Sequence, residues 1–198
     1  MRILVVGATG DIGSAVATAF EEAGHEVIRA SRRIAPPGLR VDLGDRATIA
    51  ALFDRVGRVD GVVSCAGEAR WGALSTLSEE DFSFSFANKV MGQVNLVRLG
   101  VDHVSDGGVF LLTAGIFGTA PPPGVPALAM VNGALESFAR AAALDLPRGI
   151  RILTMSPPWL HETAAKAGKT GAISAKDNAA FYVAAATGND TGKVVFPE

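Results

Sequence analysis

Residues Met1–Gly13 read MRILVVGATGDIG, and this stretch decides the fold of the chain that follows. The apolar run Ile3–Val6 is too short for a helix and is rich in β-branched residues, so it predicts a strand. The run ends at Gly7, where a glycine-spaced turn begins and leads into an alanine-rich pattern with helical spacing. The stretch therefore predicts a strand, a tight turn and a helix.

The turn has the chemistry of a phosphate-binding site. Glycines at positions 7, 10 and 13 let the backbone approach a pyrophosphate closely. The amides at the start of the helix add hydrogen-bond donors and a partial positive charge. The spacing GxxGxxG is a relative of the dinucleotide fingerprint and not its usual form, so a plain strand-to-helix turn is the alternative interpretation.

Composition sets the class of protein. With 198 residues, 48% of them hydrophobic, the chain can bury one full core, and we expect a single domain over residues 1–198. A net charge of −2 and the lack of long basic clusters argue against nucleic-acid binding. The single cysteine, Cys65, excludes an intramolecular disulfide. We see no signal peptide and no run of the roughly 20 apolar residues that span a bilayer, so we expect a cytoplasmic protein.

A second site follows the second predicted strand. Residues Glu26–Ala30 read as a strand, and Ser31, Arg32 and Arg33 come directly after it. An acidic residue at this place would accept hydrogen bonds from the ribose of NAD, whereas an arginine would meet the 2′-phosphate of NADP. The pair of arginines therefore favours NADP, and a solvated pair at the start of a loop is the alternative.

The next segments continue the alternation of predicted strands and helices. Leu39–Asp42 predicts a short strand, and Asp42 at its end either accepts from an adenine amino group or turns the chain. Asp45 can cap a helix with apolar positions at helical spacing. Val59–Gly67 predicts a buried strand that runs into small residues, where Cys65 reads as packing rather than as a nucleophile.

The order of segments resembles the short-chain dehydrogenase/reductase family. The likeness rests on GATGDIG, VDL and SCAG, and it continues through VMGQVNLV, GGVFLLTAG, ALESFARAAALDL, GIRILTMSPP and TGKVVFPE, so it covers nearly the whole chain. It implies an α/β fold, a doubly wound parallel sheet (Rossmann fold) of about seven strands with helices on both faces, which the alternating patterns also favour.

The resemblance also implies a cofactor and its contacts. We expect NADP(H) in preference to NAD(H), and a small carbonyl or alcohol as substrate. The residues expected to hold the cofactor are Gly7, Thr9, Gly10, Asp11, Ile12, Gly13, Ser31, Arg32, Arg33, Asp42, Leu43, Cys65, Ala66, Gly67 and Pro157.

The expected catalytic residues are where the chain departs from the family. The family uses a tyrosine and a lysine four residues apart, and the alignment puts Leu128 and Asn132 at these positions. A leucine has no proton to give, so the usual chemistry is missing. The only tyrosine, Tyr182, lies far along the chain, and we do not expect it to substitute.

Two other residues are candidates for the missing roles. Thr113 lies near the position of the family's serine, where it could orient a carbonyl or simply end a strand. Lys89 aligns with the family's asparagine, where an amine could donate to an oxyanion; a surface lysine is the alternative.

Two tryptophans and the segment 160–176 are candidates for the wall and the lid of a substrate pocket. Trp71 and Trp159 could wall an apolar pocket, or could be packing only. The alanine- and glycine-rich segment 160–176 predicts a loose loop and a poor lid. The three histidines are scattered without a partner at ligand spacing, so no metal is predicted.

Two predicted helices have apolar faces that favour association with a second copy of the chain. Valines at helical spacing in 90–104 and the alanine-rich helix 127–146 leave more than one apolar face, and in the resembled family such helices form the interface of a homodimer or homotetramer. Two functions stay open: an NADP-dependent oxidoreductase with a non-standard proton donor, and a catalytically silent NADP-binding sensor or assembly subunit.

Overall fold

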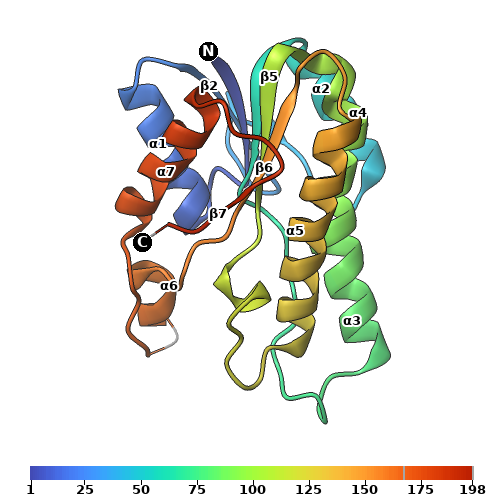
Figure 1. The fold of residues 1–198 in the computed structure, drawn as a ribbon, viewed down its shortest axis with the longest axis vertical. Coiled ribbons are helices and arrows are strands. Elements are labelled where there is room, and N and C mark those ends of the chain that lie inside the picture. Colours follow the sequence, from blue (N-terminus) through green and yellow to red (C-terminus); the bar gives the residue numbers. More distant parts are fainter. Residues whose placement is uncertain (167, 198) are drawn as a thin grey trace.

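Seven parallel strands form one twisted sheet in the order β3-β2-β1-β4-β5-β6-β7 (Figure 1). The structure is a computed structural model that describes residues 1–166 and 168–197. The strands are β1 (Arg2–Val6), β2 (Glu26–Ser31), β3 (Leu39–Arg40), β4 (Val59–Ser64), β5 (Val104–Thr113), β6 (Arg151–Met155) and β7 (Val194–Val195). The predicted doubly wound parallel sheet is confirmed.

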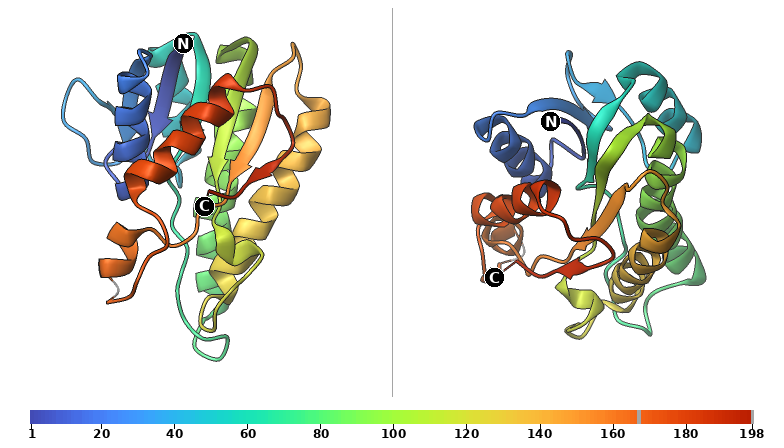
Figure 2. Two further views of the ribbon diagram at one scale, coloured as in Figure 1. Left: turned by 60° about the vertical axis from the view of Figure 1, so that its left-hand side comes forward. Right: turned by 45° about the horizontal axis from the view of Figure 1, so that its top comes forward.

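Helices cover both faces of the sheet, as the two views of Figure 2 show. The helices α1 (Asp11–Glu22) and α7 (Ala175–Thr187) lie together on one face, and α2 (Arg46–Val56), α4 (Gly92–Gly100) and α5 (Pro126–Asp145) lie on the other. Phe20 and Tyr182 fill the core on the α1 side, whereas Phe53, Leu96 and Leu135 fill the core on the α5 side. Alternate residues of each strand serve the two cores because side chains alternate across a strand.

The order of the strands alone indicates where a ligand site lies. The chain runs outward from β1 to β2 and β3, then returns so that β4 pairs with the other edge of β1. In open parallel sheets a crevice forms at the carboxyl ends of the strands where the order reverses. Here that crevice lies beyond Val6 and Ser64, the last residues of β1 and β4.

The consecutive helical segments over residues 79–103 differ from the helix that the sequence predicts. They are α3 (Glu79–Ser85), a π-helical segment η1 (Phe86–Met91), α4 and a short 3-10 turn η2 (Val101–His103). The predicted helical face over 90–104 is wrong at its end, because Val104 already begins β5. The π-helical segment has no counterpart in the sequence pattern, and such segments are often found at functional sites. It contains Lys89 and Val90, which are both buried.

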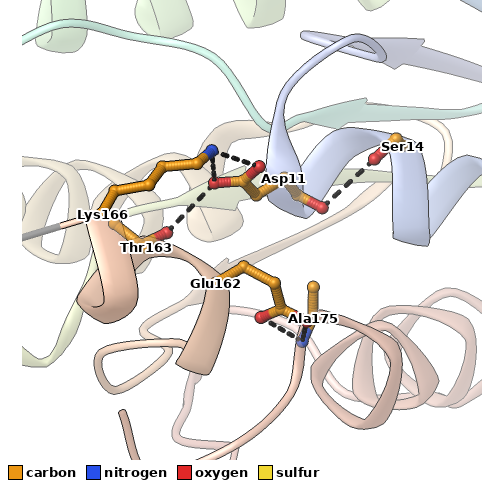
Figure 3. Close-up of polar contacts among 6 residues, drawn as sticks. All are labelled: Asp11, Ser14, Glu162, Thr163, Lys166 and Ala175. Atoms are coloured by element: carbon orange, nitrogen blue, oxygen red, sulfur yellow. Dashed lines mark hydrogen bonds and ion pairs between the residues drawn. The ribbon is translucent and has the colours of Figure 1, made fainter. Parts of the chain in front are cut away.

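The segment 160–176 is more ordered than its composition predicts. Residues His161–Lys166 form the short helix α6. Figure 3 shows how two carboxylates hold this helix: Lys166 Nζ pairs with Asp11 at 2.6 and 2.7 Å, and Glu162 accepts from the amide of Ala175 at 3.0 and 3.1 Å. The expectation of a loop is wrong for residues 161–166, whereas residues 168–174 form turns and bends between α6 and α7. Ala167 and Glu198 lie outside the described residues, although the predicted segments 160–176 and 191–198 include them.

Candidate active site

A first cavity of about 210 Å³ opens at the carboxyl ends of β1, β2 and β4. It brings together residues from five separate stretches of the sequence; four of them follow strands, because parallel strands end at the same edge of the sheet, and the fifth supplies Asn88. The expected cofactor residues that line it are Gly7, Thr9, Gly10, Ser31, Arg32, Asp42, Leu43, Cys65, Ala66 and Gly67. Asn88 and Glu68 line it as well, and the sequence did not single them out.

The glycine turn is built for close approach. Gly7 has a φ of +88°, and a Cβ there would lie 2.7 Å from the carbonyl oxygen of Cys65. Gly13 lies against the carbonyl oxygen of Gly7, so it permits the packing of α1 on the turn and does not line the cavity. Gly10 has no side chain to cap the helix, and among the described residues no side chain takes that role. The amides of the first turn of α1 are therefore available to an anion.

The hydroxyls and arginines beside the turn extend the site. The hydroxyls of Thr9 and Ser31 are hydrogen bonded to each other at 2.7 Å, and both residues line the first cavity. Arg32 and Arg33 line an adjoining hollow together with Arg40, which the sequence analysis missed because it lies on a different strand. The pairing of Ser31 with Arg40 across β2 and β3 brings the three guanidinium-bearing side chains to one place. Arg32 also pairs with Glu68 at 2.9 Å, and both side chains are about half exposed.

A second cavity of about 270 Å³ shares Gly67 and Glu68 with the first. The two cavities therefore adjoin along the end of β4. Ile12 and Pro157, both expected at the cofactor, line the second cavity, and so do Trp71 and Trp159. The prediction that the tryptophans wall an apolar pocket is supported by this placement. Its other lining residues are Gly67, Glu68, Ala69, Lys89, Ala114, Gly115, Ile116, Phe117, Leu128, Asn132, Pro158, Leu160 and Thr163.

Lys89 is the one ammonium group buried in the second cavity wall among the described residues. Its side chain is 8% exposed, so the alternative of a surface lysine is wrong. Nζ donates a hydrogen bond to the carbonyl oxygen of Ala114 at 3.1 Å. Burial lowers the pKa of Lys89 from 10.5 to about 8. The π-helical backbone at 86–91 and the bare α-carbon of Gly67 make room for this inward position.

Leu128 and Asn132 stand on α5 where the resemblance expects the tyrosine and lysine, and both line the second cavity. Asn132 Nδ2 donates to the carbonyl oxygen of Gly115 at 3.2 Å. That carbonyl follows directly after the Ala114 carbonyl that Lys89 binds. The side chains of Lys89 and Asn132 therefore converge on one short stretch of backbone from different helices.

Thr113 does not reach the second cavity. Its hydroxyl donates to the carbonyl oxygen of Ser64 at 2.6 Å and lies 2.9 Å from the hydroxyl of Tyr182. Its side chain therefore faces α7 on the opposite side of the sheet. The geometry gives no support to Thr113 as a group that contacts a substrate, because strand alternation turns the hydroxyl away from the site.

Two other expected site residues, Asp11 and Cys65, lie at its margin or are chemically inert, and Tyr182, which was not expected to take part, lies elsewhere. Asp11 lines a hollow on the α6 side and is paired with Lys166. Burial raises the pKa of the Cys65 thiol to about 12, against a smaller effect of its hydrogen bond with Thr113. The thiol stays protonated at neutral pH, which agrees with packing and not with nucleophilic chemistry. Tyr182 is fully buried away from the second cavity.

The structure adds two findings on metals and membranes. Within residues 1–166 and 168–197, no group of three or more His, Cys, Asp or Glu side chains is arranged to hold a metal ion. In the same part of the chain, no helix combines the length and the apolar character needed to cross a membrane.

The chain belongs to the short-chain dehydrogenase/reductase family. The family model described as enoyl-(acyl carrier protein) reductase matches residues 7–196. The 2,3-dihydro-2,3-dihydroxybenzoate dehydrogenase of Escherichia coli (strain K12) is 32% identical in an alignment of 168 residues that covers 79% of this chain and 68% of that enzyme. Elsinochrome reductase 1 of Elsinoe fawcettii is 30% identical in an alignment of 165 residues that covers 72% of this chain and 61% of that protein. The chain thus spans about two thirds of the length of these curated relatives.

A solved structure covers the chain from end to end. The protein lin1944 from Listeria innocua is 36% identical, with a TM-score of 0.95 and full coverage of both chains. Together, the family match and the fold define a short-chain dehydrogenase/reductase-type oxidoreductase with a nucleotide-binding crevice.

Proposed function

We propose that the protein is an NADP(H)-dependent oxidoreductase that interconverts a small carbonyl compound and its alcohol, with the Lys89 ammonium as the proton donor. The observation that carries this proposal is the placement of Lys89 Nζ in the wall of the second cavity, beside the cavity that fits a nucleotide. The family's tyrosine is replaced by leucine, so a proton must come from another group.

The residues of the first cavity fit a dinucleotide. The absence of a Cβ on Gly7 lets the turn pack against Cys65 and Ala66 at the end of β4, and the uncapped amides of α1 follow this turn, where a phosphate could accept from them. Thr9 and Ser31 would add hydroxyl donors. Arg32, Arg33 and Arg40 would take the 2′-phosphate that distinguishes NADP from NAD, because guanidinium groups bind phosphate oxygens in pairs.

The reduced nicotinamide would supply a hydride to the carbonyl carbon. The chain's own part is to hold the carbonyl and to give a proton to its oxygen. Lys89 is fixed by its bond to Ala114 and keeps further N–H groups for an oxygen in the cavity. With a pKa of about 8 the side chain is mostly protonated at neutral pH and close enough to neutrality to release its proton. It regains a proton from water after each turnover.

The proposal is tested by binding and turnover measured on the same variants. NADPH and NADH are titrated by nucleotide fluorescence, and NADPH oxidation is followed against a panel of aldehydes and ketones. We expect NADPH to bind more tightly than NADH. Replacing Lys89 with Met should lower kcat by about 100-fold or more while the Kd for NADPH changes little, because general acid catalysis contributes that much.

Three results would overturn the proposal. One is a Lys89→Met variant that keeps the wild-type kcat. A second is a protein that binds neither nucleotide below millimolar concentration. A third is tight binding of NADPH with no turnover of any carbonyl in the panel, which would favour a silent sensor.

A further inference from the structure

Three aromatic side chains form one wall of the second cavity. They come from three different loops: Trp71 follows β4, Phe117 lies in the turn after β5, and Trp159 follows β6. The indole rings of Trp71 and Trp159 stack with centroids 5.8 Å apart and an interplanar angle of 15°. Phe117 meets both indoles edge-on, at 6.1 and 5.7 Å. We call these three residues the aromatic wall.

The aromatic wall is not ordinary core packing. Trp71 is 53% exposed, although indole is the side chain with most to gain from burial. None of the three residues belongs to either main hydrophobic core as a buried member. All three residues line the second cavity, so apolar ring surface borders it, although Lys169 Nζ lies 5.2 Å from the centroid of the Trp159 ring. A flat conjugated ligand can cover such a surface.

The lining of the second cavity also contains an unusual polar pair, Lys89 and Asn132. Lys89 Nζ is a donor bound to the Ala114 carbonyl, and Asn132 Nδ2 is a donor bound to the Gly115 carbonyl. The bond to Gly115 fixes the orientation of the Asn132 amide, so Oδ1 is its remaining acceptor. Among the described residues Asn132 Oδ1 has no hydrogen-bond partner, although Asn132 is only 1% exposed. Buried polar atoms are rarely left without a partner, so this oxygen points to a ligand donor.

The polar pair and the aromatic wall together define a ligand class. An oxygen that accepts from Lys89 and a neighbouring hydroxyl that donates to Asn132 Oδ1 would satisfy both side chains. A planar ring attached to the same group would cover the aromatic wall. We propose that the second cavity selects aryl ketones that carry a hydroxyl group on the carbon next to the carbonyl, with Asn132 and the aromatic wall as the specificity-determining residues. This inference rests on the proposed function, since it names the substrate class of the same site.

Four ketones separate the two features of the proposed substrate. They are α-tetralone, its derivative with a hydroxyl on the carbon next to the carbonyl, cyclohexanone, and α-hydroxycyclohexanone. We expect kcat/KM with NADPH to be highest for the hydroxylated tetralone. We expect removal of its hydroxyl, or replacement of the aryl ring by the aliphatic ring, to cost about tenfold or more each.

Two variants assign the preferences to residues. In Asn132→Leu the advantage of the hydroxylated ketones should disappear while the advantage of the aryl ketones remains. In Trp159→Leu the aryl advantage should fall and the hydroxyl advantage should remain. Binding gives an independent readout, because both tryptophans of the chain lie in the aromatic wall and their fluorescence reports on this site alone. The hydroxylated tetralone should change that fluorescence, and cyclohexanone should not.

The outcomes separate this inference from the proposed function. If all four ketones are reduced with similar kcat/KM, the inference is wrong and the reductase proposal stands. If Asn132→Leu weakens NADPH binding and leaves the preference among ketones unchanged, Asn132 Oδ1 serves the nucleotide and the substrate class is also wrong. If NADPH binds but none of the four ketones is reduced and none changes tryptophan fluorescence, the inference fails, and the wider carbonyl panel then decides the proposed function.

Discussion

Lys89 Nζ donates its hydrogen bond to the backbone carbonyl oxygen of Ala114, 25 residues away, at 3.1 Å inside the protein. Within the described residues no carboxylate forms an ion pair with this ammonium group. A buried charge held by one carbonyl costs stability, and the lowered pKa of Lys89 reflects that cost. The chain therefore keeps a group that is unfavourable for folding at the place where the proposed reaction requires a proton donor.

Replacing Lys89 with Met should stabilise the protein at pH 7. The pKa of Lys89 is about 8 in the fold against 10.5 in the unfolded chain, so the folded state carries the full penalty below about pH 8. A shift of this size corresponds to about 3 kcal/mol, and loss of the hydrogen bond returns about 1 kcal/mol. Urea unfolding should show a net gain of about 2 kcal/mol at pH 7 that shrinks as the pH rises toward 10.5.

Exposed Lys176 offers the matched control for this measurement, because Lys176→Met should change stability little at either pH. A Lys89→Met protein that is less stable than wild type at pH 7 would show that the lysine is a structural residue.

The contact of Gly67 with Lys89 provides a second test. Gly67 has a φ of +132°, and a Cβ there would lie 2.8 Å from Lys89 Cγ and 3.1 Å from its Cα. Gly67→Ala should therefore displace Lys89, reduce carbonyl turnover, and destabilise the fold by about 2 kcal/mol or more. Gly57→Ala separates the two causes, since Gly57 has a φ of +68° with no atom within 4 Å of its Cβ position. Equal loss of activity in both variants would contradict the role of the contact.

The hollow lined by Arg32, Arg33 and Arg40 indicates that NADPH binds in preference to NADH. Arg32→Ala and Arg40→Ala should each weaken NADPH binding by about tenfold or more and leave NADH binding nearly unchanged, because a charged hydrogen bond to the 2′-phosphate is lost. Glu68→Gln should act in the opposite direction, since Glu68 pairs with Arg32 at 2.9 Å and repels a phosphate. Arg98→Ala, an exposed change on α4, is the control. Equal losses for NADPH and NADH would contradict this reading of the arginines.

The pair between Lys166 and Asp11 fastens α6 beside the glycine turn (Figure 3). Because the Lys166 side chain is 69% exposed, Lys166→Met should change the free energy of unfolding by less than about 1 kcal/mol. It should nevertheless raise the KM for the carbonyl substrate, since Thr163 on the same helix lines the second cavity. Amide hydrogen exchange in 161–166 should become faster in this variant. Unchanged exchange would show that the pair does not hold the helix.

Much of the fold follows from the sequence because its signals are local. The apolar run before Gly7 and the helical spacing after it predict β1 and α1, and Asp45 caps α2 through the amide of Ala47 as its position indicates. The segment 86–104 was harder to predict, since a π-helical segment and a change from helix to strand at Val104 leave the apolar pattern almost unbroken. The helix in 161–166 is held in part by Asp11, which lies 155 residues before Lys166, and a local pattern cannot indicate such a contact.

The site residues that lie in one contiguous segment could be predicted from the sequence. Those that come together from several segments could not. The glycine turn and the arginines after β2 are each contiguous in sequence. Arg40, Glu68 and the acceptor of Asn132 join the site only through the pairing and packing of separate elements. Thr113 failed as a candidate because one residue of register decides which face of a strand receives the side chain. The expected homodimer or homotetramer stays a prediction.

The pH dependence of NADPH-driven carbonyl reduction tests Lys89 as the proton donor most directly. At saturating NADPH, kcat/KM of the wild type should be level below the pKa of about 8 and fall about tenfold per pH unit above it. The Lys89→Met variant should be slow, with no break near that pH. A wild-type profile that stays level through pH 8, or a Lys89→Met profile that matches it, would contradict the assignment.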